Sequence, residues 1–146
     1  MKPGKVRPIA LCVFRHRGRI LVAEGYDVVK DEVFYRPIGG KIEFGERGAE
    51  TIVREVKEEL DLDVTNVRYL GTLESIFEYD GQKGHEICLI YDGKFVDEAV
   101  YTQDGLEAVE DDESLYVAIW KDFEDFLYST APLYPEGLYE LLEKVR

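Results

Sequence analysis

The chain has 146 residues with 31 acidic and 18 basic side chains, a formal net charge of −13 with both histidines neutral. This length is typical of one domain that buries its own core, so we expect a single domain over residues 1–146. Hydrophobic residues make up 45% of the chain, too many for a disordered polyelectrolyte. The negative charge would repel the phosphates of duplex nucleic acid and excludes it as an expected partner, whereas a small phosphorylated ligand bridged by divalent cations stays open.

The two cysteines and the lengths of the apolar runs bear on the cellular compartment of the protein. Cys12 and Cys88 lie in apolar runs without a CxxC pair, so we expect two buried free thiols, with a disulfide between them as the alternative. The apolar run at residues 9–14 is too short for a signal peptide, and no stretch is long enough to span a membrane. The sequence therefore predicts a cytoplasmic protein without membrane contact.

The first third of the chain is rich in strand patterns. Apolar runs at residues 9–15 and 19–24 flank a His-Arg-Gly tripeptide, which predicts a hairpin with Gly18 at its turn. Pro37 cannot occupy a central strand, so the chain should leave the sheet there. Residues 39–46 contain three glycines, which predicts a loop of demanding conformation.

Residues 48–60 are strong helix formers and predict one helix. Four apolar residues at helical spacing should form its buried stripe: Ile52, Val53, Val56 and Leu60. Three carboxylates cluster about 120° away: Glu55, Glu58 and Glu59. Arg54 and Lys57 cannot neutralise this whole cluster, because adjacent helical residues point in different directions. A hard cation such as Mg²⁺ can, because it prefers oxygen ligands; the alternative is a solvated acidic face.

The second half of the chain returns to strands. Residues 67–78 and 85–95 predict a hairpin joined by a polar loop. Six acids among the ten residues 104–113 predict an acidic loop, which precedes a strand at residues 115–120. Helices are expected from about residue 121 and from about Pro135, because proline suits a first helical turn.

One spacing in the chain is highly specific. Gly40 is followed after five residues by Glu46 and after seven more by Arg-Glu-Val-Lys-Glu-Glu-Leu-Asp-Leu at residues 54–62. This pattern resembles the Nudix hydrolase signature at every position except the last glycine, where Asp61 stands. Glycine is favoured after a helix because it adopts a left-handed conformation, so we expect a cap weakened by up to about 1 kcal/mol and no loss of a carboxylate ligand.

The resemblance implies an α/β fold of the α+β type, a Nudix-type α/β/α sandwich with a mixed β-sheet between helices. It also implies hydrolysis of a phosphoanhydride bond in a nucleoside diphosphate linked to another moiety X, with Mg²⁺ or Mn²⁺. The family pattern places the metal-binding and catalytic positions at the three helical carboxylates, with Glu55 and Glu59 as the strongest ligands and Glu58 less certain. Arg54 could pair with Glu46 and fix the loop on the helix, and Gly39 could offer its carbonyl to the metal.

The general base stays open between a glutamate of the motif and an acid of the later segment. The later candidates are Glu107, Glu110, Asp111, Asp112 and Glu113. Among them we favour Glu110 and Glu113, because they precede the strand that ends in Trp120. The alternative for each is a solvated acidic loop.

Substrate contacts are predicted from charge and aromaticity. Arg36 could bind a phosphate with its guanidinium, with a purely structural role as the alternative. Glu86 lies at the start of a strand and, if it faces the cleft, is a candidate substrate-binding residue, ligand or base. Four aromatic residues could stack on a base, or belong to the core: Phe34, Tyr35, Phe77 and Tyr79.

Two functions from different classes fit the sequence. The first is a metal-dependent nucleotide pyrophosphohydrolase, and the alternative is a non-catalytic Nudix-fold nucleotide-binding or regulatory module. The complete set of glutamates, with Arg54 beside them, favours catalysis. A homodimer is compatible with either function.

Overall fold

The computed structural model describes residues 4–145, so both ends of the predicted domain, residues 1–3 and 146, lie outside the described residues. The described strands and helices are, in chain order, β1 (Val6–Val13), β2 (Arg15–His16), β3 (Arg19–Asp27), β4 (Glu32–Arg36), β5 (Ile38–Lys41), α1 (Gly48–Leu60), β6 (Val64–Tyr79), β7 (Gln82–Phe95), η1 (Glu98–Thr102), β8 (Gly105–Val109), β9 (Leu115–Asp122), η2 (Phe123–Leu127) and α2 (Leu138–Lys144). No helix within residues 4–145 has the length and hydropathy needed to cross a membrane.

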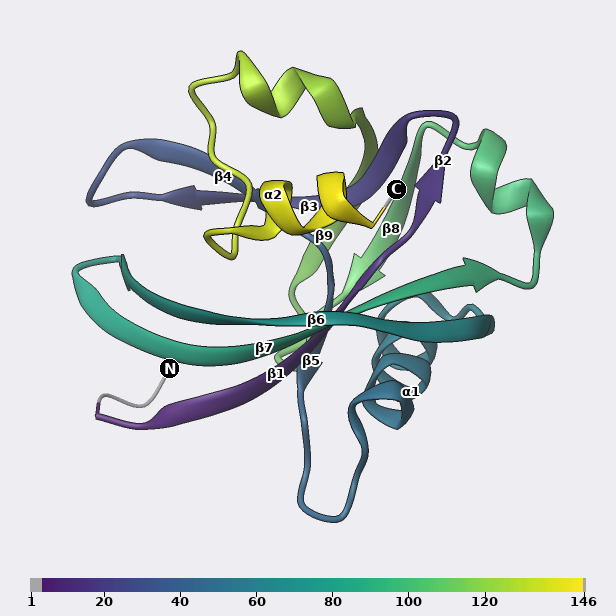
Figure 1. Cartoon of the computed structure of the whole chain (residues 1–146), viewed down its shortest axis with the longest axis horizontal. Coiled ribbons are helices and arrows are strands. Elements are labelled where there is room, and N and C mark those ends of the chain that lie inside the picture. The colour runs from purple at the N-terminus through teal and green to yellow at the C-terminus, as the bar shows by residue number, and fades with distance from the viewer. Residues whose placement is uncertain (1–3, 146) are drawn as a thin grey trace.

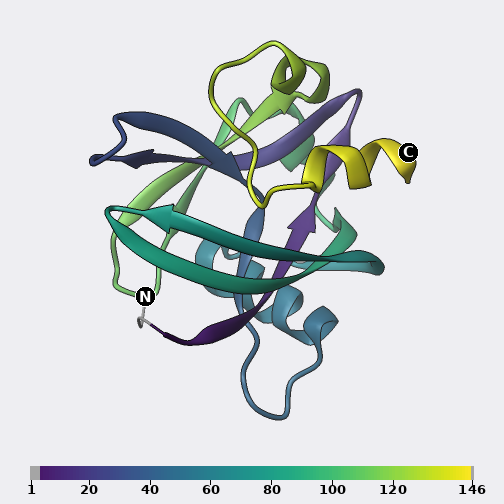
Figure 2. The same ribbon diagram turned by 60° about the vertical axis from the view of Figure 1, so that its left-hand side comes forward.

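The strands form two sheets. The first has the order β5-β1-β7-β6, and it is mixed because β1 and β7 run parallel whereas the other pairs are antiparallel. The second has the order β2-β3-β9-β8, with β4 paired to β3. Figures 1 and 2 show α1 and α2 on opposite sides of the first sheet. This arrangement confirms the expected mixed sheet between helices.

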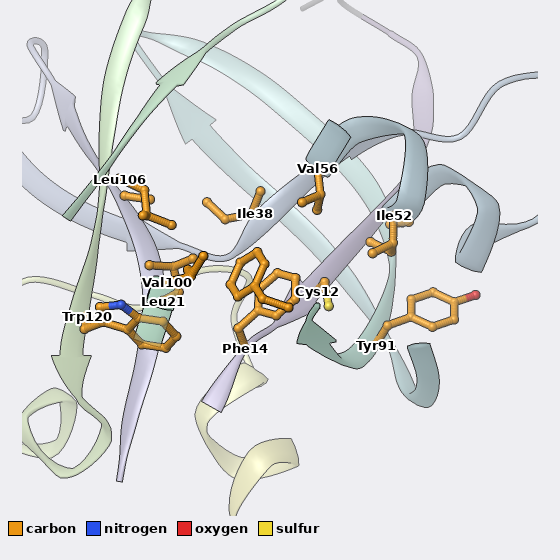
Figure 3. Packing of buried hydrophobic residues seen from close by; sticks show 13 residues of the cluster. Cys12, Phe14, Leu21, Ile38, Ile52, Val56, Tyr91, Val100, Leu106 and Trp120 are labelled. Carbon is orange, nitrogen blue, oxygen red and sulfur yellow. The ribbon is translucent and has the colours of Figure 1, made fainter. Parts of the chain in front are cut away.

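The alternation of side chains along β1 explains the two cores. Successive residues of a strand point to opposite faces, and β1 is apolar on both. One core contains Ala10, Cys12 and Phe14 together with Ile52 and Val56 of α1, and Figure 3 shows this packing. The other core contains Ile9, Leu11 and Val13 together with Leu138 and Leu142 of α2. The central sheet is therefore covered on both faces.

The two cysteines are free and buried, as expected. Cys12 belongs to the core under α1, whereas Cys88 belongs to the core under α2. Burial raises the pKa of both thiols, most strongly that of Cys12, and keeps them protonated.

The structure corrects the predicted loop at the glycines. Pro37 does leave the sheet, but only as the single residue between β4 and β5, and Gly39 and Gly40 lie within β5. Gly39 pairs with Leu11 of β1, and a Cβ atom on Gly39 would overlap the carbonyl of Ala10. Glycine is therefore required here for close strand packing and not for a loop.

Four further predictions were wrong in part. The acidic segment 104–113 contains strand β8, because its apolar residues alternate with its acids and face the core. The helix expected from residue 121 is the short 3₁₀ helix η2 that follows β9, and the helix expected from Pro135 begins at Leu138. Val53 is 48% exposed and does not belong to the buried stripe of α1.

Candidate functional site

Helix α1 buries two of its three glutamates. Glu55 and Glu59 are 4% and 6% exposed, whereas Glu58 is exposed. The two lie beside Ile52 and Val56, so the face that packs on the core carries two carboxylates and does not include Val53. Burying a carboxylate is costly without a partner of opposite charge. The helix therefore places two carboxyl groups inside the protein, where each needs a partner.

Gly40 on β5 lies directly against Glu55. A Cβ atom on Gly40 would overlap the carboxylate of Glu55, so any other residue here would displace it. The absence of a side chain on Gly40 thus leaves space for the buried carboxylate of Glu55. This contact explains in physical terms why glycine stands at position 40.

Arg54 connects the loop before α1 to the carboxylates. Its guanidinium donates to both carboxylate oxygens of Glu46 at 2.8 and 3.0 Å, which confirms the expected ion pair. It also donates to Glu55 at 2.9 Å, to Glu58 at 3.2 Å and to the carbonyl of Lys41 at 3.1 Å. The ion pair with Arg54 lowers the pKa of Glu46 to about 2. Arg54 has no such bond to Glu59, so it neutralises only part of the cluster. The expected separation of adjacent residues is wrong for Arg54 and Glu55, because the long arginine side chain reaches the carboxylate of its neighbour.

The acidic segment brings a fourth carboxylate to the helix. Oxygen atoms of Glu55, Glu58 and Asp111 lie within 4.8 Å of one another. Asp111 belongs to the turn between β8 and β9, and β8 packs beside α1. Sequence reasoning named Asp111 only as one candidate base and favoured its neighbours instead.

Glu59 lies deeper, under Tyr116 of β9. The Tyr116 hydroxyl donates to one oxygen of Glu59 at 2.9 Å, and the other oxygen is buried without a partner. Burial and the neighbouring carboxylate of Glu55 raise the pKa of Glu59 well above its usual range, and the hydrogen bond from Tyr116 opposes them. Tyr116 was missed, although a two-residue alternation back from Trp120 and Ala118 would have turned it inward.

The remaining acids of the segment have different places. Glu110 borders the neighbouring cavity, and burial and the charges of Asp112 and Asp111 raise its pKa, with Arg36 opposing. Asp112 accepts hydrogen bonds from the backbone and hydroxyl of Ser114 and so stabilises its own turn. Glu113 donates its backbone N–H to Glu110, and Glu107 is exposed on β8. Of the two favoured bases, the cavity includes Glu110.

A cavity of about 370 Å³ adjoins the acidic cluster, and Glu110 and Tyr116 belong to its lining. Arg36 and Glu86 also line it and are paired at 3.4 Å. Glu86 is 5% exposed and pairs with Arg7 at 3.9 Å as well. The structure therefore brings both predicted substrate contacts to one place.

Aromatic side chains form much of the cavity's surface. Three of the four aromatic candidates, Phe34, Phe77 and Tyr79, line it, together with Tyr134 and Tyr116. Tyr35 packs instead in the core under α2, where Lys121 lies 4.8 Å from its ring. Alternation along β4 explains the difference, because Phe34 and Tyr35 point to opposite faces. A cavity with aromatic walls and a few charged groups can hold a planar ring and fix its orientation.

The donor set suits a hard divalent cation. Every clustered donor is a carboxylate oxygen, the ligand type that Mg²⁺ and Mn²⁺ prefer. One oxygen of Glu59 is buried without a partner, and the carboxylate of Glu55 is buried as well. A bound cation would offset the unfavourable free energy of burying these groups. The residues therefore fit such a metal.

A family model described as NUDIX domain matches residues 4–144 of the chain. No curated protein sequence matches the chain significantly. Among solved structures, a MutT NUDIX hydrolase from Burkholderia pseudomallei is 21% identical and has a TM-score of 0.68, with 97% of this chain and 99% of that chain covered.

Two MutT structures from other organisms show the same fold. The protein from Bacillus halodurans is 18% identical with a TM-score of 0.64, and covers 95% of this chain and 81% of its own. The protein from Methanosarcina mazei is 20% identical with a TM-score of 0.60, and covers 98% of this chain and 93% of its own.

Proposed function

The chain belongs to the NUDIX domain family and is a pyrophosphohydrolase of that family, and we propose that it cleaves a nucleoside diphosphate linked to another group X with the help of Mg²⁺ or Mn²⁺. The observation that carries this proposal is the acidic cluster Glu55, Glu58 and Asp111 beside a cavity with aromatic walls. The cluster suits the metal and the phosphates, and the cavity suits the base.

The carboxylates of Glu55, Glu58 and Asp111 would hold the metal, with Glu59 behind them and the Gly39 carbonyl as a further donor. When bound, the metal neutralises phosphate charge and lowers the pKa of the attacking water. Arg54 holds Glu55 in place and ties it to Glu46. It therefore acts on the reaction by orienting a ligand.

Glu110 is the proposed general base. It borders the cavity next to the acidic cluster, and its raised pKa suits a group that must accept a proton from water near neutral pH. Arg36 is the proposed phosphate contact, because it lines the same cavity and carries a planar, bidentate donor. Glu86 keeps Arg36 oriented through their ion pair.

We include in this proposal a single domain over residues 1–146, a cytoplasmic location and a small nucleotide as the substrate in place of duplex nucleic acid. The net charge of −13 supports the last point, because a polyanion gains no affinity from such a surface.

A panel of nucleoside diphosphate compounds tests the function. Each compound is incubated with the protein and Mg²⁺ or Mn²⁺, and phosphate release is measured through a coupled phosphatase. We expect turnover of at least one compound, abolished by a chelator and by Glu55→Gln. If no compound is hydrolysed while several raise the melting temperature, the alternative of a nucleotide-binding module replaces the enzyme.

A further inference from the structure

Two hairpins from different sheets form opposite sides of the cavity. The hairpin of β3 and β4 contributes Phe34 from β4 and Lys30 from the connecting turn. The hairpin of β6 and β7 contributes Phe77 and Tyr79, both from β6. Figures 1 and 2 show both hairpins extending in the same direction with their tips close together. Within residues 4–145, no strand pairing joins one hairpin to the other. Side chains must therefore fix the width of the cavity.

Asp27 joins the two tips. It is the last residue of β3 and is only 2% exposed. One carboxylate oxygen accepts hydrogen bonds from the backbone of Val29 at 3.0 Å and Lys30 at 3.2 Å, in its own turn. The other oxygen accepts the backbone N–H of Asp80 at 3.3 Å, in the turn of the second hairpin. A buried carboxylate needs such donors, so this contact constrains both turns.

The bond to Asp80 also places an aromatic ring. Tyr79 is the residue before Asp80, and its ring meets that of Phe34 edge to face with centroids 5.7 Å apart. The ring of Phe34 packs directly on Gly25, in the space that a Cβ atom would occupy, so it cannot move further toward β3. A shift of the second hairpin would therefore move Tyr79 relative to a fixed Phe34.

We propose that Asp27 is a positioning residue, which holds the two hairpins at the separation that lets Phe34 and Tyr79 contact the ring of a nucleotide substrate. This inference rests on the proposed function, since the phosphates of that nucleotide would lie at the acidic cluster. Asp27 is not a member of the cluster formed by Glu55, Glu58 and Asp111. It sets the affinity for substrate and leaves the rate of the chemical step unchanged.

The variant Asp27→Asn separates the two roles of the side chain. Its single carbonyl oxygen can keep the local turn, whereas its NH₂ group cannot accept from the Asp80 N–H. For the best substrate of the panel we expect KM to rise about tenfold, about 1.4 kcal/mol, with kcat within about twofold of wild type. Asp31→Asn is the matched control, because it removes the same charge at the same hairpin tip. Asp31 accepts a hydrogen bond from the hydroxyl of Tyr26, which belongs to its own hairpin, and not from the second hairpin.

Amide hydrogen exchange at Asp80 measures the contact without any substrate. We expect exchange about tenfold faster in Asp27→Asn and unchanged in Asp31→Asn. An unchanged KM, a kcat that falls as much as kcat/KM, or unchanged exchange at Asp80 would overturn the proposal. If Asp27→Asn does not fold, Tyr79→Leu must raise KM with kcat retained, and an unchanged KM then overturns it.

The two proposals fail in distinguishable ways. If wild-type protein hydrolyses nothing in the panel, the proposed function is lost. Calorimetry with ADP in the absence of metal then decides the role of Asp27: weaker ADP binding by Asp27→Asn than by Asp31→Asn supports it, and equal binding contradicts it.

Discussion

Tyr116 donates its hydroxyl hydrogen to Glu59 across 2.9 Å and so connects β9 to α1 behind the acidic cluster. The other oxygen of Glu59 is buried and unpartnered, and the neighbouring carboxylate of Glu55 helps to raise the pKa of this carboxyl. The connection holds the strand that follows the acidic turn, and hence Asp111, beside the helix. Without metal, the same place concentrates buried carboxyl groups, and their burial opposes folding.

The variant Glu59→Gln tests both consequences. We expect turnover with Mg²⁺ to fall by about 100-fold or more, because a ligand or its immediate support loses its charge. We expect the metal-free protein to be slightly more stable than wild type at neutral pH, because the raised pKa of Glu59 means that folding must keep this carboxyl protonated at a pH where the unfolded chain ionises it, and glutamine removes that cost. Turnover and thermal unfolding without metal measure the two effects.

Tyr116→Phe is the matched control for this variant, because it removes the hydrogen bond to Glu59 and leaves the carboxyl, whereas the glutamine of Glu59→Gln keeps an oxygen that can accept this bond. It should lower metal-free stability, since Glu59 then loses its one donor at 2.9 Å. Near-wild-type turnover of Glu59→Gln would contradict its role at the metal, whatever the control does.

Glu46 makes stability depend on acid pH. Its pKa in the folded protein is about 2, below the ordinary 4.5, because the guanidinium of Arg54 hydrogen-bonds the carboxylate. A lowered pKa gives stability that is fully present above about pH 4.5 and is lost as the pH falls toward 2. We therefore expect Glu46→Gln to lower the melting temperature at pH 7, and the difference from wild type to shrink between pH 4.5 and 2.

Glu43→Gln serves as the control for this series. Glu43 lies 3.8 Å from Arg54 with its side chain 65% exposed, and exposed ion pairs contribute little. A pH-independent difference between wild type and Glu46→Gln would contradict the assigned ion pair.

Arg36 and Glu86 form a pair whose roles in binding and in stability can be separated. Arg36→Gln should raise KM and also destabilise the protein, because the buried Glu86 is left with Arg7 at 3.9 Å. Adding Glu86→Gln removes the unpaired charge and should restore stability without restoring KM. Melting temperatures and KM values of the two single variants and the double variant form the cycle. Recovery of KM in the double variant would show that Arg36 acts only on Glu86.

The sequence predicted the parts of the site that depend on local spacing. Helix α1 runs over the predicted residues 48–60, and the Arg54–Glu46 pair follows from positions eight residues apart across a helix start. The Gly39–Gly40 segment was misassigned, because glycines that permit a loop also permit close packing of β5 on β1. Local pattern does not distinguish these uses, since the partner strand is distant in sequence.

The roles of the acidic segment required tertiary information. Six acids in ten residues gave no reason to prefer Asp111, since the choice depends on how the β8–β9 turn meets α1. Arg7 is opposite Glu86 only because β1 and β7 pair in parallel with that register. Asp27 could not be recognised either, because its third donor is 53 residues away.

Asp61 at the end of α1 tests the one departure from the motif. Asp61 has a φ of 55° and donates its N–H to the carbonyl of Lys57, the left-handed cap in which glycine is favoured. Asp61→Gly should raise stability by about 0.5–1 kcal/mol in chemical denaturation, because the strain of a Cβ atom disappears. The exposed Lys57–Asp61 pair offsets little of this gain. Turnover should be unchanged, and a loss of turnover would mean that Asp61 contributes to the site.

Asp111 is the acid of the later segment that the structure joins to the metal-binding carboxylates. Asp111→Asn should raise the Mg²⁺ concentration for half-maximal turnover by about 10- to 100-fold, because a ligand or its support loses its charge. Asp112→Asn removes the same charge one residue away, but Asp112 bonds to Ser114, and an asparagine can still accept those bonds. Equal shifts in both variants would show that only the overall charge of the turn attracts the metal. A shift confined to Asp111→Asn requires direct participation, because the two positions differ in geometry and not in charge.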